Sequence, residues 1–299
     1  MKKNLVFLIS EACNHDCVYC IRQEKDKKTL FSGNFLNPDK NNILKHLNLY
    51  KGFTDEISLT GGEPLLNSQL ADIIQLAIDN GIKKINIHTN GSLLGRQDMV
   101  DLFTKYKDHL KLVVSLPSTD REVFKQISQA DNLAAIMNNL EEYWVRGFDL
   151  HLNIVVSKLN LDSLKQSVID LTALGFKNLQ LLGIDTYNKD YNIEYAQSLP
   201  VLDEIVGQFS DRIGFKLYAM PKCVFRNFKH LAGIYQIKAN RATYNELTIG
   251  SKSLLLKTDY LKLSRKKIKA CKLCGYSSNC EGILKSYLGL YGENEFKPF

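Results

Sequence analysis

Hydrophobic and polar residues follow two alternating periods along this chain. Short apolar runs typical of buried strands occur at residues 5–10, 56–60, 84–89, 111–116, 151–156 and 177–182. Between these runs, apolar residues recur at steps of three and four, which indicates amphipathic helices at residues 39–50, 68–80, 96–107, 133–146 and 161–174. Strands that alternate with helices predict an α/β fold, in which a parallel sheet is covered by helices.

Six strands joined by right-handed crossovers predict a partial (β/α)6 barrel of the TIM type. In such folds, ligands bind at the carboxyl ends of the strands. In this interpretation the alternation stops near Asp185, where a polar stretch begins. We therefore expect three parts: the partial barrel at residues 1–184, a linker at 185–213 and a small domain at 214–299.

Length and composition limit the class of protein. The chain has 299 residues, 44% of them hydrophobic, which is enough for one large core with a small domain beside it. No apolar run is long enough to cross a bilayer. The first ten residues, MKKNLVFLIS, fit a first strand better than a signal peptide because their apolar run is short. We expect a soluble cytoplasmic protein with no membrane partner.

The charge is unevenly distributed. The net charge is +7, yet residues 212–269 carry 14 lysines and arginines against two acidic residues, Glu246 and Asp259. This segment is either a solvated basic face or the source of a field that attracts an anionic substrate.

Three of the seven cysteines lie in one loop directly after the first predicted strand: Cys13, Cys17 and Cys20. Clustered cysteines in a reducing compartment are more often metal ligands than disulfides. A cubane iron–sulfur cluster held by three thiolates keeps one iron open to a small molecule. The alternatives are a ferredoxin-like cluster with a fourth, distant cysteine, and a zinc site completed by His15, although His15 is expected to point away.

The CxxxCxxC spacing, with an aromatic residue before its last cysteine, resembles the signature of radical SAM enzymes. The GGEP sequence at residues 61–64, after the second strand, is similar to a second motif of that family, and the resemblance covers about residues 4–184. It implies that S-adenosylmethionine binds the open iron of a [4Fe-4S] cluster and is cleaved reductively to a 5′-deoxyadenosyl radical. That radical would abstract a hydrogen atom from a substrate, with flavodoxin or ferredoxin as the electron donor.

The resemblance also implies cofactor contacts near this cluster. Gly61 and Gly62 would let the backbone approach the ligand closely, and Glu63 would accept a hydrogen bond from the methionine ammonium. Tyr19 is the aromatic residue of the cysteine motif and is included among the cofactor contacts.

The resemblance implies further cofactor contacts at the next three strands. Asn90 belongs to a Thr-Asn-Gly turn, although an ordinary strand-to-helix turn explains the same residues. Ser115 ends the fourth strand and would touch the ribose or carboxylate of the cofactor, but Pro117 stands where the family more often has aspartate. Asn153 on the fifth strand is expected either to face the cofactor or to be a satisfied polar residue of the core.

A second group of cysteines lies near the C-terminus. The spacing of these residues resembles the SPASM and twitch domains, and Leu284 stands where a full SPASM domain would have another cysteine. A second, auxiliary [4Fe-4S] cluster is therefore expected on four thiols: Cys223, Cys271, Cys274 and Cys280. The alternatives are a structural zinc site, or a free Cys223 that donates a hydrogen atom to a substrate radical, as in an epimerase.

Three functional classes follow. The chain is a peptide maturase or epimerase, an enzyme for an anionic small metabolite, or a non-enzymatic module, stabilised by zinc or iron–sulfur, that binds nucleic acid or protein. The absence of a leader-binding segment before the first strand weighs against a peptide, and the absence of an aromatic RNA motif weighs against nucleic acid. GTP 3′,8-cyclases have a similar architecture, but their Arg-rich Gly-Gly tail and C-terminal cysteine spacing are missing, so that activity is not expected.

Overall fold

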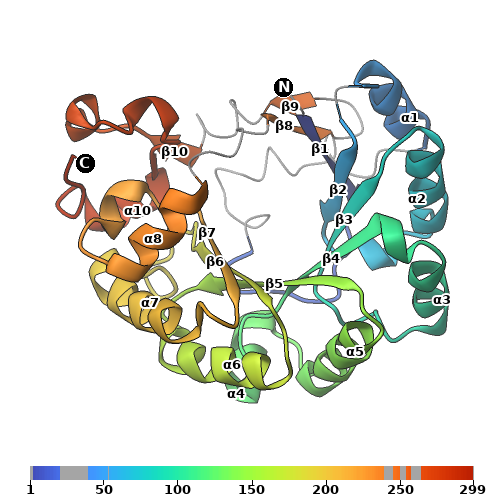
Figure 1. Cartoon of the computed structure of the whole chain (residues 1–299), viewed down its shortest axis with the longest axis horizontal. Coiled ribbons are helices and arrows are strands. Elements are labelled where there is room, and N and C mark those ends of the chain that lie inside the picture. Colours follow the sequence, from blue (N-terminus) through green and yellow to red (C-terminus); the bar gives the residue numbers. More distant parts are fainter. Residues whose placement is uncertain are drawn as a thin grey trace.

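A curved parallel sheet with helices on its outer side forms the body of the protein (Figure 1). The computed structural model describes residues 3–20, 40–52, 54–238, 245–249, 254–256 and 264–298. The first seven strands are neighbours in chain order: β1 (Lys3–Ser10), β2 (Glu56–Gly61), β3 (Lys84–Thr89), β4 (Leu110–Ser115), β5 (Asp149–Val156), β6 (Asn178–Gly183) and β7 (Gly214–Tyr218). The predicted α/β class with a partial, open TIM-like barrel is confirmed.

The helices that cover the sheet come from the segments between the strands. They are α1 (Lys40–Leu49), α2 (Leu70–Asp79), α3 (Gln97–Lys105), α4 (Arg121–Ser128), α5 (Leu133–Val145), α6 (Leu161–Ala173), α7 (Tyr195–Phe209) and α8 (Lys229–Lys238). Short 3-10 turns lie at η2 (Pro64–Leu66), η3 (Lys107–His109), η4 (Lys222–Phe225), η5 (Lys269–Leu273) and η6 (Ser277–Asn279). All five predicted helices are present, within one or two residues at each end.

The expectation that the alternation ends near Asp185 is wrong. Within the segment interpreted as a linker, α7 forms, and β7 then pairs in parallel with β6, from Asn178↔Gly214 to Leu182↔Tyr218. Burial of its apolar side stabilises the helix, and Leu202 and Ile205 on that side are both fully buried. The polar stretch after Asp185 forms the loop between β6 and α7. The division into three domains stays a prediction.

The far C-terminal half also returns to the barrel sheet. β8 (Asn245–Ile249) pairs in parallel with β1, and β9 (Leu254–Leu256) pairs antiparallel with β8. A separate two-stranded sheet joins β10 (Arg265–Lys266) to β11 (Ile283–Leu284), and α10 (Lys285–Tyr291) follows. Part of the segment predicted as a separate small domain therefore extends the sheet beyond β1.

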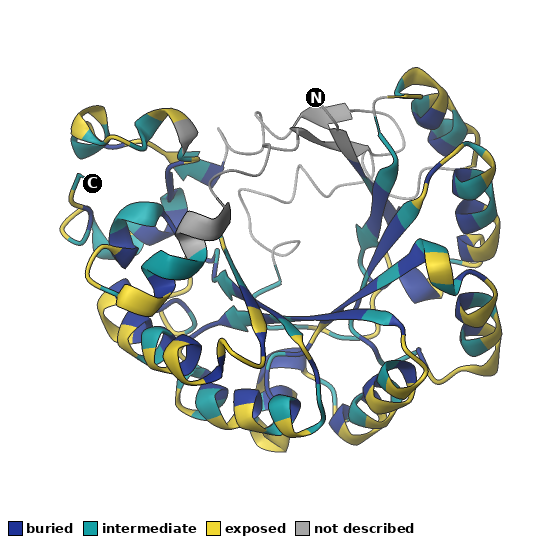
Figure 2. Cartoon of the chain, in the orientation of Figure 1, coloured by how far each residue is buried: buried dark blue, intermediate teal, exposed yellow. Residues whose placement is uncertain are grey.

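The two faces of the sheet differ in chemistry. Side chains of successive strand residues point to opposite faces, and one set packs under the helices in the hydrophobic core. Figure 2 shows exposed residues on the outward sides of the helices, while the strands are largely buried. The opposite set lies on the concave face and is largely polar in β3 to β7: Asn86, His88, Lys111, Ser115, His151, Asn153, Gln180 and Lys216.

The C-terminal tail packs back on the barrel, as predicted. Tyr287 of α10 stacks on Tyr195 of α7 with ring centroids 4.3 Å apart, and Phe296 packs edge-on against both rings. The hydroxyl of Tyr287 accepts a 2.9 Å hydrogen bond from the backbone N–H of Tyr195. Across the described residues, none of the helices combines the length and apolar character needed to span a membrane.

Candidate iron–sulfur and cofactor site

The first cysteine loop, residues 11–20, follows β1 and is held by the end of α4. The backbone N–H of Asp16 donates to the carbonyl of Ser128 at 3.1 Å, and that of Val18 donates to Ile127 at 3.0 Å. Cys13 is exposed, while Cys17 and Cys20 are half-buried. The sequence did not predict α4, so this anchor was missed; the acidic residue Asp120, which caps the helix through the N–H of Val123, was the available signal.

The three thiols of this loop lie close enough to affect one another. Burial, followed by the neighbouring Cys20 and Cys13, raises the pKa of Cys17 to about 12. Thiolates crowded in this way need a compensating cation, because metal coordination is what deprotonates such groups at neutral pH. The donor set therefore fits an iron–sulfur cluster. Within the described ranges, no three His, Cys, Asp or Glu side chains are arranged to hold a single metal ion.

The side chain of His15 is held by contacts with Asn132 and Phe124. Its Nε2 lies 3.1 Å from Nδ2 of Asn132, and its ring packs edge-on against Phe124 of α4 at 6.0 Å. Burial lowers the pKa of His15. These contacts agree with the expectation that His15 does not complete the three-cysteine site.

The GGEP turn is pinned to the cysteine loop by its backbone. The N–H of Gly62 donates to the carbonyl of Ser10 and the N–H of Glu63 donates to the carbonyl of Ala12, both at 2.7 Å. Gly61 has φ +137°, and a Cβ placed there would lie 2.5 Å from the carbonyl oxygen of Ser10. A glycine is thus required at position 61 because the backbone of Ser10, its register partner on β1, occupies the space of a side chain. The sequence argument instead ascribed this glycine to the approach of a ligand.

Glu63 is fully buried, and its carboxylate is satisfied by the protein. Oε1 accepts from the hydroxyl of Thr89 at 2.7 Å and from the N–H of Leu65 at 3.1 Å, while Oε2 accepts from the N–H of Asn90 at 2.8 Å. Burial raises the pKa of Glu63, and the three hydrogen bonds oppose that shift. In this structure Glu63 fixes the turn after β3 beside the turn after β2; its contact with a methionine ammonium stays a prediction.

Asn90 connects the third strand to the cysteine loop. Its Nδ2 donates to Oδ1 of Asn14 at 2.8 Å and lies 4.0 Å from Sγ of Cys13. Asn14 in turn donates to the hydroxyl of Ser92 at 2.8 Å. The loop after β1 and the turns after β2 and β3 therefore meet at one edge of the sheet, which is the edge predicted for ligand binding.

The remaining predicted contacts lie beside this edge. Ser115 and Asn153 are register neighbours on β4 and β5, and the N–H of Leu116 donates to the carbonyl of Asn153 at 2.9 Å. Ser115 is exposed, whereas Oδ1 of Asn153 is buried without a hydrogen-bond partner among the described residues. Tyr19 is half-buried, and burial followed by the nearby Cys17 raises its pKa. An unsatisfied buried amide oxygen favours a ligand contact for Asn153 over an ordinary core role.

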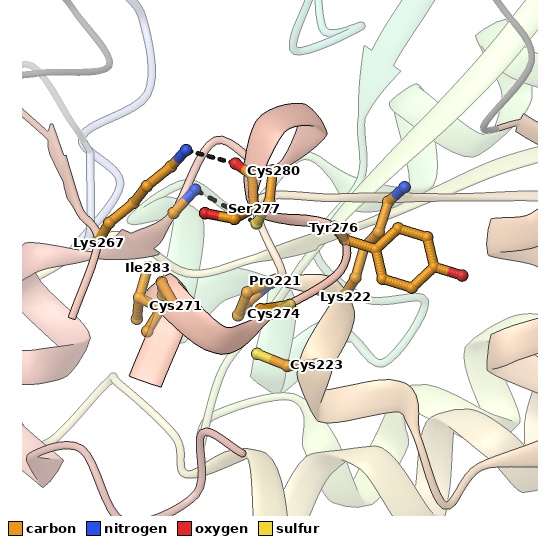
Figure 3. A pocket seen from close by; sticks show the side chains of 11 residues that line it. Pro221, Lys222, Cys223, Lys267, Cys271, Cys274, Tyr276, Ser277, Cys280 and Ile283 are labelled. Carbon is orange, nitrogen blue, oxygen red and sulfur yellow. Dashed lines mark hydrogen bonds between the residues drawn. The ribbon is translucent and has the colours of Figure 1, made fainter. Parts of the chain in front are cut away.

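The second group of cysteines lines one cavity in the C-terminal part (Figure 3). Cys223 belongs to η4, which lies beside the loop that carries Cys271, Cys274 and Cys280. Burial, followed by the nearby thiols of Cys280, Cys271 and Cys274, raises the pKa of Cys223 to about 12. The four thiols are thus neighbours although 47 residues separate Cys223 from the next one, and this donor set fits an auxiliary cluster.

The loop that carries Cys280 is braced against β10. Gly282 has φ +95°, and a Cβ there would lie 2.8 Å from the carbonyl oxygen of Lys266. The guanidinium of Arg265 donates to the carbonyl of Gly282 at 3.2 Å, and the ammonium of Lys222 lies 4.6 Å from the ring centroid of Tyr276. The cavity therefore has a defined wall on the side of the small sheet.

Comparison with known protein families supports the interpretation of these motifs. The family model described as "Radical SAM superfamily" matches residues 7–171, which is more than half of the chain. The chain belongs to the radical SAM superfamily. Membership brings the cofactors of that family, a [4Fe-4S] cluster and S-adenosylmethionine, and its general radical chemistry.

Curated relatives within the superfamily include proteins named for one activity. A probable GTP 3′,8-cyclase of Sulfurisphaera tokodaii is 28% identical over 215 residues, covering 71% of this chain and 66% of the relative. A GTP 3′,8-cyclase of Clostridium botulinum is 28% identical over 237 residues, covering 74% and 68%. The chain spans about half to two thirds of the length of the first three relatives. A missing tail is therefore no ground to exclude that activity, contrary to the argument from the sequence.

Solved structures share the fold at low identity. Streptococcus suis SuiB bound to S-adenosylmethionine aligns with a TM-score of 0.67 and 15% identity, covering 100% of this chain and 76% of that one. The anSMEcpe protein with bound AdoMet aligns with a TM-score of 0.69 and 14% identity, covering 99% and 93%. At this identity the likeness shows only that the chain shares the fold of those two proteins.

Proposed function

We propose that this chain cleaves S-adenosylmethionine reductively on a cluster held by Cys13, Cys17 and Cys20 and abstracts a hydrogen atom from an anionic small-molecule substrate. One observation supports the site above all others. The three-thiol loop is hydrogen-bonded to the turn of residues 61–64 and contacts Asn90, at the carboxyl ends of three adjacent strands.

The residues around the cysteine loop have distinct tasks in this proposal. With its cluster bound, the site supplies the electron that splits S-adenosylmethionine into methionine and a 5′-deoxyadenosyl radical. Glu63, through Thr89 and Asn90, holds two turns in fixed positions. Asn153 offers a buried amide oxygen to a donor of the cofactor, and Ser115 beside it presents an exposed hydroxyl. Such preorganised contacts orient the cofactor and limit side reactions with water.

The C-terminal site is proposed to hold a second [4Fe-4S] cluster on Cys223, Cys271, Cys274 and Cys280, in a twitch-like arrangement. Four thiols around one cavity support this assignment, and Cys223 then acts as a ligand and not as a hydrogen donor. A structural zinc ion in the same place is the competing assignment. Flavodoxin or ferredoxin is the proposed electron donor.

The substrate class is the finer part of the proposal. Relatives named GTP 3′,8-cyclase support a nucleotide or another anionic metabolite, and the basic balance of residues 212–269 agrees. A solved structure titled as SuiB bound to the precursor peptide SuiA shares the fold with this chain at 16% identity, which does not favour a peptide. A peptide substrate, as in a maturase or epimerase, remains an outcome of the experiment below.

The experiment combines metal analysis with cofactor turnover. Anaerobically reconstituted protein is expected to bind about eight irons per chain and to release 5′-deoxyadenosine from S-adenosylmethionine in the presence of dithionite. Changing Cys13, Cys17 and Cys20 to alanine should remove about four irons and all 5′-deoxyadenosine. His15→Ala is the matched control in the same loop and should change neither. Zinc in place of iron, or no 5′-deoxyadenosine from the reconstituted chain, would refute the proposed function. Candidate nucleotides and peptides are then screened for substrate-dependent stimulation.

A further inference from the structure

Three polar side chains lie in one row across the concave face of the sheet. Ser115 of β4 is the register partner of Asn153 of β5, and Asn153 is the register partner of Gln180 of β6. The residues before and after each of the three belong to the core under the helices, so these side chains point to the concave side. Neighbouring strands are about 4.8 Å apart, so two adjacent side chains of the row can contact the same ligand.

The side-chain amide of Gln180 has no partner within the protein. The residue is 9% exposed, and its side chain makes no hydrogen bond among the described residues. An amide offers one acceptor oxygen and two donor hydrogens, and burial of these groups without partners destabilises a fold. Buried polar groups in native proteins are almost always paired, so this exception needs an explanation, and a bound ligand supplies one.

His151 adds a second unpaired group on the same face. It precedes Asn153 by two positions, about 6.6 Å along the strand, and is 7% exposed. Because a carboxylate only accepts hydrogen bonds, Nε2 of His151 carries the proton that is donated to Asp149 at 3.0 Å. Burial lowers the pKa of His151, so the ring is neutral at neutral pH and Nδ1 is an acceptor. Nδ1 is buried without a hydrogen-bond partner among the described residues.

The unpaired atoms select the chemistry of the ligand. Oδ1 of Asn153 and Nδ1 of His151 are both acceptors, and both are buried without a partner in the part of the chain that the structure describes. A phosphate oxygen is also an acceptor, so an anionic group at this place would leave both atoms unpaired. Hydroxyl and N–H groups are donors, and the amide of Gln180 can pair with a donor or an acceptor. The face over β5 and β6 therefore fits an uncharged, donor-bearing group, such as a sugar ring or the edge of a base.

We infer that Gln180, together with Nδ1 of His151, binds the sugar or base of a nucleotide-type substrate and positions it beside the cofactor. In the strand order, Gln180 lies one strand further from the cysteine loop than Asn153. The C–H bonds of the bound sugar or base are thus next to the proposed cofactor contacts, and the phosphate lies outside this subsite. The inference rests on the proposed function and specifies which part of the substrate the sheet holds.

Calorimetry with defined probes tests this subsite without any radical chemistry. Anaerobically reconstituted protein is saturated with S-adenosylmethionine in the absence of reductant, so that the cofactor contacts are occupied. It is then titrated with the common ribonucleoside 5′-monophosphates, with ribose 5-phosphate and with inorganic phosphate. At least one sugar-bearing probe is expected to bind saturably. Gln180→Met should weaken its binding about tenfold, and should change the affinities for S-adenosylmethionine and for inorganic phosphate less than about twofold.

A stability measurement separates binding from a structural role of the same residue. Because the amide of Gln180 pairs with nothing in the protein, Gln180→Met should unfold at the same urea concentration as wild type or at a higher one. Gln166→Met is the matched control on the outer side of the barrel. It removes a 2.8 Å hydrogen bond to Asp170 and should leave the binding of every probe unchanged.

Several outcomes would overturn the subsite: no binding of any sugar-bearing probe, equal binding by Gln180→Met and wild type, or a main effect of the variant on S-adenosylmethionine. A lower urea midpoint of Gln180→Met would assign the amide a structural role and overturn it as well. Release of 5′-deoxyadenosine without substrate is measured in parallel. If that activity is absent while nucleotide binding depends on Gln180, the proposed reaction fails and the subsite stands.

Discussion

The backbone N–H of Asn90 donates a 2.8 Å hydrogen bond to Oε2 of Glu63, which lies 27 positions earlier in the chain. The bond joins the turn after β3 to the turn after β2, and Thr89 strengthens the junction through Oε1 of the same carboxylate. Glu63 also reaches the cysteine loop, because its own N–H donates to the carbonyl of Ala12. The side chain and the backbone of one buried residue thus join the three segments that surround the proposed cluster.

Replacing Glu63 by glutamine should loosen that junction. The amide keeps the size of the side chain but loses one acceptor oxygen, so at least one of the three donors is left unpaired in a buried place. We expect a loss of about 1–3 kcal/mol in the free energy of unfolding of the apo chain, measured by urea denaturation, and a lower iron content at the first site. Glu142→Gln at an exposed ion pair with Arg146 is the control, with an expected change within about 0.5 kcal/mol. Equal effects of the two variants would contradict this role.

Gly61 is predicted to be intolerant of any side chain. Alanine at this position would combine φ +137° with a Cβ placed 2.5 Å from the carbonyl oxygen of Ser10. Because both atoms belong to paired strands, neither can move without disturbing the register of β1 and β2. Gly61→Ala should destabilise the fold by about 2–3 kcal/mol or prevent soluble expression. Gly81→Ala, at φ +85° with open space around it, isolates the cost of the dihedral angle, about 1 kcal/mol. The steric argument fails if both variants unfold at the same urea concentration.

The pair of Asp149 and His151 predicts a pH dependence of stability. The hydrogen bond to His151, followed by Lys84, lowers the pKa of Asp149 to about 2, against 3.8 when unperturbed. Because the folded-state pKa is the lower one, this interaction stabilises the fold above about pH 4 and is lost as the pH falls toward 2. Asp149→Asn should therefore reduce stability at pH 5 and converge with wild type near pH 2. Urea midpoints across that range measure the difference. Asp72→Asn, at an exposed pair with Lys40, should show no such convergence.

The sequence predicted the local elements well because each has a clear period. Strands and amphipathic helices form by burying one face, and the spacing of apolar residues within a short segment indicates that face. The helix α7 was missed because it contains Pro200 and a polar loop precedes it, yet the apolar spacing over its roughly four turns still buries Leu199 and Phe209. Long-range pairing was not predictable in this way: nothing in residues 245–249 indicates that they lie beside β1.

The site was predictable in its motifs and not in its internal contacts. The cysteine spacing and the GGEP sequence follow the first two predicted strands, and the structure brings these two segments together at one edge of the sheet. The partner of a buried polar group depends on how turns far apart in sequence meet, so the attachment of Glu63 to Thr89 and Asn90 could not be read from the chain. The polar character of the concave face could be predicted from the sequence. Lys111, His151 and Lys216 each lie between two apolar residues of a strand, so each must face the side opposite to its neighbours.

Cys223 is either a ligand of the auxiliary cluster or a hydrogen donor, and the two roles predict different spectra and chelation rates. The test uses a chain in which Cys13, Cys17 and Cys20 are alanine, so that about four irons remain, all at the C-terminal site. Adding Cys223→Ala leaves three thiols there, a number that can still retain a cluster but with one iron exposed to solvent and chelators. If Cys223 is a ligand, the electron paramagnetic resonance spectrum of the reduced cluster should change, and removal of iron by a chelator should accelerate about tenfold or more. Ser278→Ala in the same loop should alter neither. If Cys223 only donates hydrogen, spectrum and chelation rate will match those of the parent chain.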